Sequence, residues 1–216
     1  MMSEYRIQNQ IALYMTNKKL CEFNSKLQAA PVEFYGHVHA QREKIGNQRM
    51  GTSAVGIILQ DYSNGKGDKT VRVAANLAPE FFGYALMHLQ RGVDKFDFYE
   101  EKIFGEPNEQ GKSMVTRVSF KRASVGPDGK PRNYPWCVNV ENGFAVKESN
   151  AQGGAHAKQG TYQKARAVYI NINDYDMYKL LVKVTRFIQV WELSHAPKVI
   201  RDAEQISEAE RKAGAN

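Results

Sequence analysis

His37 and His39, two residues apart, are the pair whose spacing best suits a metal ion. On a strand, residues i and i+2 point the same way, so two imidazoles could share one ion. The nearest further candidate ligand, Glu33, lies further along the strand, and no third ligand stands close by. We therefore predict no metal site, and we assign both histidines to an exposed polar face that contacts nucleic acid.

Motifs of common enzyme classes are missing from this sequence. It contains no GxSxG, no GxxxxGK[ST] and no HExxH pattern. The segment Gly65-Lys66-Gly67 has some character of a phosphate loop, but it lacks the third glycine and the following helix, so it predicts a hairpin turn. Asp174 and Asp176 suit a helix N-terminus, where carboxylates interact favourably with the helix dipole. We expect neither catalysis nor a cofactor.

Positive charge is concentrated in one segment of the chain. The 216 residues include 30 Lys/Arg and 23 Asp/Glu, which gives a net charge of +7. Residues 112–170 hold ten of the cations against only Asp128, Glu141 and Glu148, so the whole excess lies there. Such a concentration attracts polyanions. A basic face kept only for solubility would have the same composition.

Hydrophobic periodicity places these groups on strands. Residues 1–30 are polar and predict an N-terminal arm or short helix. Period-two alternation predicts strands at residues 32–39, 55–59 and 71–75, and helical spacing predicts a helix from near Pro79 to Gly92. Residues 95–104 fit either a strand or a linker. Residues 31–110 are therefore interpreted as a first half, built of a sheet and a helix.

The rest of the chain shows the same order of elements. Alternating apolar residues predict strands around Val118, at 136–140 and at 168–172, and a helix opens at Asn173. Residues 111–194 are interpreted as a second half, and residues 195–216 as a C-terminal helix or tail. We predict an α+β protein with two similar antiparallel sheet-plus-helix halves, a ββββα-like repeat. Two unrelated strand–helix units in one domain would give the same order.

The outward strand face combines aromatic and basic side chains. Rings allow bases to stack, worth roughly 1–3 kcal/mol each, while cations follow the phosphates of a single strand. A duplex reader would present a basic helix to the major groove, and neither predicted helix carries a basic stripe. Trp136 has core parity and is expected to be buried. The predicted nucleic-acid-binding residues are Tyr35, His37, His39, Arg72, Arg117, Lys121, Arg122, Lys130, Arg132, Tyr134, Lys158, Tyr162, Lys164, Arg166 and Tyr169.

The layout over residues 31–192 resembles the Whirly single-stranded DNA-binding fold, which is shared with the positive-cofactor-four family. A second segment resembles single-strand-binding proteins of bacterial mobile elements. It comprises Arg132-Asn133-Tyr134-Pro135-Trp136-Cys137-Val138-Asn139-Val140-Glu141-Asn142-Gly143, followed by a Gly-rich loop and Tyr162. The resemblance implies two curved sheets that bind single strands across their surfaces and edges, in dimers or tetramers. The plant Whirly segment Lys-Gly-Lys-Ala-Ala-Leu is absent, so it supplies no residue roles.

These observations predict a non-enzymatic protein that binds single-stranded DNA or RNA with little sequence preference and forms a homo-oligomer. Cys21 and Cys137 are far apart and lack CxxC spacing, the chain has no long apolar run, and its N-terminus lacks a signal-peptide layout. We therefore expect a cytoplasmic protein without membrane contact. The alternative is a structural or protein-interaction component of a phage or mobile element, whose basic patch binds an acidic partner.

Overall fold

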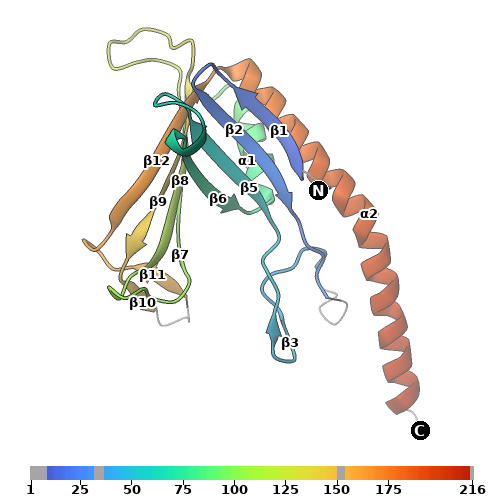
Figure 1. Ribbon diagram of the computed structural model, residues 1–216. Coiled ribbons are helices and arrows are strands. Elements are labelled where there is room, and N and C mark those ends of the chain that lie inside the picture. The colour runs from blue at the N-terminus through green and yellow to red at the C-terminus, as the bar shows by residue number, and fades with distance from the viewer. Residues whose placement is uncertain (1–8, 32–36, 150–153, 215–216) are drawn as a thin grey trace, which may run out of the picture.

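The structure is a computed structural model that describes residues 9–31, 37–149 and 154–214. Within these ranges the protein is α+β, with two antiparallel four-stranded sheets, each followed along the chain by a helix (Figure 1). The predicted fold class is confirmed at this level.

The first sheet begins earlier than the sequence suggested. Its strands, in both chain order and spatial order, are β1 (Gln10–Met15), β2 (Lys19–Lys26), β5 (Ala54–Asp61) and β6 (Val71–Leu77). The prediction of an N-terminal arm is therefore wrong for residues 10–26. Cys21 and Phe23 lie on one face of β2 and are fully buried, so this polar-looking segment contributes to the core.

The segment between β2 and β5 is less regular. A small hairpin is formed there by β3 (Lys44–Ile45) and β4 (Gln48–Arg49). Of the strand predicted at residues 32–39, positions 32–36 lie outside the described residues. Residues 37–39 do not form a regular strand, and only a single bridge joins His39 to Ala29. The predicted hairpin turn at Gly65 is present, and it includes a short 3-10 turn, η2 (Gly67–Lys69).

Helix α1 (Glu80–Gln90) follows the first sheet and ends before Gly92, as predicted. Gly92 has a φ of 64°, a left-handed conformation that glycine adopts without strain and that commonly terminates helices.

The second sheet also forms an antiparallel meander, with spatial order β12-β9-β8-β7. Its strands are β7 (Lys95–Phe104), β8 (Ser113–Ala123), β9 (Trp136–Ala145) and β12 (Gln163–Ile172). A minor hairpin of β10 (Lys147–Ser149) and β11 (Ala155–Ala157) lies between β9 and β12. Residues 95–104 are thus a strand, and the second sheet begins at Lys95 rather than after residue 110.

Helix α2 (Asp174–Gly214) is a single helix of 41 residues. Asn173 caps its start, because the Asn173 side-chain oxygen accepts a 2.8 Å hydrogen bond from the Asp176 backbone amide. The segment from 195 onward, predicted to be a helix or a tail, continues α2 up to Gly214. Figure 1 shows this C-terminal half of α2 running past the sheets.

A single hydrophobic core joins both sheets and both helices. The inner sheet faces contribute alternate residues such as Phe23 and Phe120, and the helices contribute residues such as Phe82 and Leu181. Trp136 is fully buried, as its parity predicted. The opposite face of the second sheet is left outside this core, and it carries several of the predicted binding residues.

Candidate nucleic-acid interface

Two exposed tyrosines mark the outer face of the second sheet. Strand register places Tyr99, Ser119, Asn139 and Tyr169 side by side across β7, β8, β9 and β12; we call these four residues the tyrosine row. The two tyrosines at its ends are 58% and 54% exposed. Three strand spacings separate them, about 14 Å. The small side chains of Ser119 and Asn139 leave a low floor between the two exposed rings, and Lys19 lies over one face of the Tyr169 ring.

Arg117 lies one row away from the tyrosine row but is already engaged by the protein. Its Nε donates a 2.7 Å hydrogen bond to Glu101 Oε2, and its guanidinium carbon lies 3.5 Å from the centre of the Tyr162 ring. Partial burial opposes the charged form, but the hydrogen bond to Glu101 and nearby negative charge outweigh this effect, so the pKa of Arg117 is raised. Arg117 and Tyr162 are therefore brought together, as one stacked pair rather than two free contacts.

Gly143 permits this stacked pair. A Cβ built at Gly143 would lie 2.3 Å from the Gln163 backbone oxygen and 2.8 Å from Tyr162 Cε2. Any larger residue would collide with β12 or lift the Tyr162 ring off the sheet. The Asn142-Gly143 pair lies within β9, where the backbone of β12 approaches closely.

Lys121 and Lys19 border the tyrosine row on its other side. Lys121 Nζ lies 3.3 Å from Asp97 Oδ2, in a pair that is exposed to solvent. Lys19 Nζ donates a 2.7 Å hydrogen bond to the Tyr169 backbone oxygen and lies 3.7 Å from the centre of the Tyr169 ring. Lys19 also lies 3.6 Å from Asp61, so it ties the first sheet to the edge strand β12 of the second sheet.

Four predicted phosphate ligands have no carboxylate partner within 4.0 Å among the described residues, and all four are exposed. They are Arg72, Arg132, Lys164 and Arg166. Lys164 and Arg166 lie near the start of β12, and Arg72 lies on β6, which contacts β12. Arg132 precedes β9, at the opposite end of the sheet. These four cations therefore lie at two ends of the sheet rather than in one patch.

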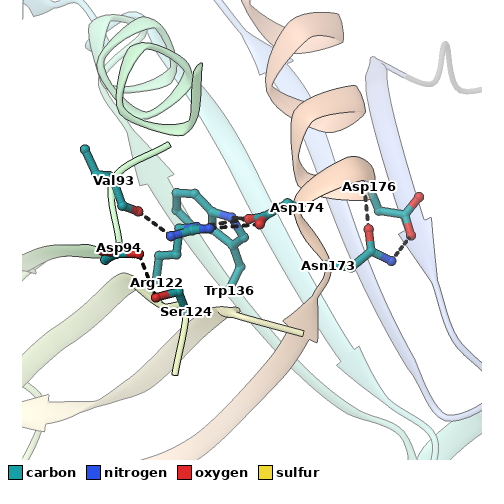
Figure 2. A network of polar contacts seen from close by, with 8 residues as sticks. All are labelled: Val93, Asp94, Arg122, Ser124, Trp136, Asn173, Asp174 and Asp176. Carbon is teal, nitrogen blue, oxygen red and sulfur yellow. Dashed lines mark hydrogen bonds and ion pairs between the residues drawn. The ribbon is translucent and has the colours of Figure 1, made fainter. Parts of the chain in front are cut away.

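Arg122 is a structural residue, which contradicts its predicted role in phosphate binding. Its side chain is only 9% exposed. Its Nε and one terminal nitrogen donate hydrogen bonds of 3.0 and 2.9 Å to Asp174, and its other terminal nitrogen donates to the Val93 backbone oxygen (Figure 2). Trp136 Nε1 donates to the same carboxylate at 2.7 Å. The hydrogen bond from Arg122 lowers the pKa of Asp174, against a smaller opposing effect of burial.

The histidines also lie away from this face. His37 Nε2 pairs with Glu43. The two nitrogens of His39 contact Ser53 Oγ at 2.8 Å and Glu192 Oε1 at 3.0 Å, and its ring stacks on Trp191. The predictions that both histidines belong to an exposed binding face are wrong, because each ring is held by its own polar partners.

The remaining predicted residues lie at the periphery. Lys130 and Lys158 pair with Asp128 and Glu148, at 3.9 and 3.2 Å. Tyr134 is exposed and lies just before the start of β9, whereas Tyr162 lies just before the start of β12. Because β9 and β12 are antiparallel, these two rings lie at opposite ends of the strand pair and do not meet. Tyr35 lies outside the described residues.

Sequence reasoning missed Tyr99 and Lys19. Tyr99 belongs to β7, which alternates Phe96 and Phe98 toward the core with Asp97 and Tyr99 outward. This alternation could have identified the strand and its outward ring. Lys19 was overlooked because β2 was taken for part of an arm.

Within the described ranges, no helix combines the length and apolarity needed to cross a bilayer, and no group of three or more His, Cys, Asp or Glu side chains could hold a metal ion. No protein-family model, curated protein or solved structure matches this chain.

Proposed function

We propose that this protein binds single-stranded nucleic acid on the outer face of its second sheet. The observation that carries the proposal is the tyrosine row, in which two exposed rings flank a floor of small polar side chains. Each ring offers a face for one base, worth roughly 1–3 kcal/mol. Base pairs in a duplex stack on each other and do not offer these faces, so single strands are favoured.

Electrostatics have a secondary role in this proposal. Asp97, Glu101 and Glu141 lie on the same face; the first two are paired with cations and Glu141 accepts a 3.5 Å hydrogen bond from the Tyr162 hydroxyl, so the centre of the face carries no excess positive charge. Two cations without a carboxylate partner among the described residues lie beside this face: Lys164 pairs in register with Gly143, and Arg132 is close enough to Cys137 on β9 to act on the pKa of that thiol. Lys121, whose pair with Asp97 is exposed to solvent, is a third cation that the phosphates of a bound strand can reach. We therefore attribute affinity mainly to stacking, with about three phosphate contacts.

A Whirly-like relationship is part of the same proposal. Two four-stranded meanders, each followed by a helix and sharing one core, support it. The proposal includes no catalytic role, since the tyrosine row has no acid–base pair poised at a cavity.

A titration of fluorescent oligonucleotides tests this function. A single-stranded 20-mer should bind more tightly than the same sequence as a duplex, in both DNA and RNA. Three neutralised phosphates predict a slope of log affinity against log salt of about −2. Absence of binding at low salt would refute the proposal. Binding of an acidic polypeptide without oligonucleotide binding would instead support an interaction role with an acidic partner.

A further inference from the structure

The C-terminal half of α2 carries an apolar stripe that no described residue covers. Val190, Leu193 and Ile200 are 65%, 75% and 54% exposed, and Pro197 between them is also exposed. We call these four residues the α2 stripe, and three of them, Leu193, Pro197 and Ile200, line a shallow hollow on the helix surface. From this stripe and the charges at its ends we propose that α2 pairs in antiparallel orientation with α2 of a second copy of this chain.

The spacing of the stripe matches a helix–helix seam. Its residues follow one another at intervals of three, four and three, the alternation found in pairs of helices that pack side by side. Residues on the opposite side of the helix, including Ile188, Val199 and Ala203, are buried. With about 100° per residue, the stripe therefore points away from the side of α2 that is already packed. Two copies joined along it would carry their sheets on opposite sides.

Charged residues extend the seam at both ends. Arg186 lies four residues before Val190, and Glu204 lies four residues after Ile200. Both are exposed, and neither forms an ion pair within the described part of the chain. The seam thus begins with an unpaired cation and ends with an unpaired anion.

This charge order selects the antiparallel orientation. A two-fold axis at position 195 sets Val190 opposite Ile200 of the second copy and Leu193 opposite Pro197. The same axis sets Arg186 opposite Glu204 of the second copy, so each end of the seam closes with an ion pair. A parallel pairing would instead set Arg186 opposite Arg186 of the second copy and Glu204 opposite Glu204 of the second copy. Both contacts would be between like charges and therefore repulsive. The geometry therefore specifies both the partner and the register.

Sedimentation of the full chain tests the pairing. The wild type should show a reversible monomer–dimer equilibrium between about 5 and 200 µM, because a short apolar seam gives modest affinity. Leu193→Glu should be monomeric throughout this range. Met15→Glu is the matched control, since Met15 is also largely exposed, at 63%, but lies on β1, and it should dimerise as the wild type does. Circular dichroism confirms that each variant is folded.

A charge exchange tests the orientation. Arg186→Glu and Glu204→Arg should each weaken the dimer by about three- to tenfold at low salt. The double variant, or an equimolar mixture of the two single variants, should recover most of the loss, because every antiparallel contact is again between opposite charges.

Cross-linking separates the two orientations. In a Cys137→Ser background, the Val190→Cys/Ile200→Cys variant should form intermolecular disulfides between positions 190 and 200. The Val190→Cys variant alone should not, because in the antiparallel pair the two copies of position 190 lie about 15 Å apart along the helix axis. Efficient cross-linking of Val190→Cys alone would overturn the antiparallel register. A wild type that stays monomeric at 200 µM, or a dimer unaffected by Leu193→Glu, would overturn the proposal itself. None of these outcomes depends on nucleic-acid binding.

Discussion

The guanidinium of Arg117 stacks on the Tyr162 ring at 3.5 Å while its Nε is hydrogen-bonded to Glu101. This arrangement makes Arg117 a support for the sheet surface rather than a free phosphate ligand. We predict that Arg117→Ala lowers the free energy of unfolding by about 1–2 kcal/mol, because it leaves Glu101 without its partner. Oligonucleotide affinity should change less than about threefold. Loss of binding at unchanged stability would show instead that Arg117 contacts phosphate.

Tyr99 and Tyr169 should account for most of the binding energy. We predict that Tyr99→Ala and Tyr169→Ala each weaken single-strand binding by about 1–3 kcal/mol, which is roughly fivefold to more than a hundredfold. The corresponding Phe variants should bind nearly normally, because they keep the ring. Tyr175→Ala, an exposed ring at the start of α2, serves as the matched control. Equal losses from all three Ala variants would contradict a specific role for the tyrosine row.

Gly143 should tolerate no side chain. Gly143→Ala is expected to destabilise the protein by about 1–3 kcal/mol, because the new Cβ would overlap the Gln163 backbone. Gly83→Ala in α1 is the control: a Cβ there meets nothing within 4 Å, so this variant should be up to about 1 kcal/mol more stable than the wild type. Urea unfolding midpoints measure both. A neutral Gly143→Ala would mean that β12 can move away from β9.

The pair formed by Arg122 and Asp174 should make stability depend on pH in acid. Because the pKa of Asp174 is lowered in the folded protein, its contribution is complete above the unfolded pKa of about 3.9 and is lost as pH falls through the folded pKa. Asp174→Asn should therefore be about 1–2 kcal/mol less stable than the wild type at pH 7. The difference between the two proteins should shrink below pH 4. A constant difference from pH 7 to pH 3 would exclude this linkage.

Sequence patterns predicted the elements that alternate cleanly and missed those that do not. The strands containing Val73, Val138 and Ile170 have strict alternation and a β-branched face, so they were found. The strand β2 has only Cys21 and Phe23 on its buried face, between polar residues. Its identity as a strand depends on pairing with β5, and such non-local pairing is not encoded in a short window.

Site residues were harder to predict, since parity identifies a face but not the partners across it. The register that sets Glu101 beside Arg117 and Asp97 beside Lys121 arises from the pairing of β7 with β8. Arg122 is different, because it shares the parity of Val118 and Phe120, and this parity could have identified it as a residue on the core side of β8 rather than a phosphate ligand. Its carboxylate partner, Asp174, comes from α2, 52 residues further along the chain.

Photo-cross-linking locates the bound strand most directly. A single-stranded oligonucleotide carrying 5-bromouracil should cross-link to the tryptic peptides spanning residues 96–102 and 167–179, which contain Tyr99 and Tyr169. The yield should fall in the Tyr99→Ala/Tyr169→Ala variant and under an excess of unlabelled single strand, but not under an excess of duplex. Cross-links confined to other peptides, or none at low salt, would contradict single-strand binding on the tyrosine row.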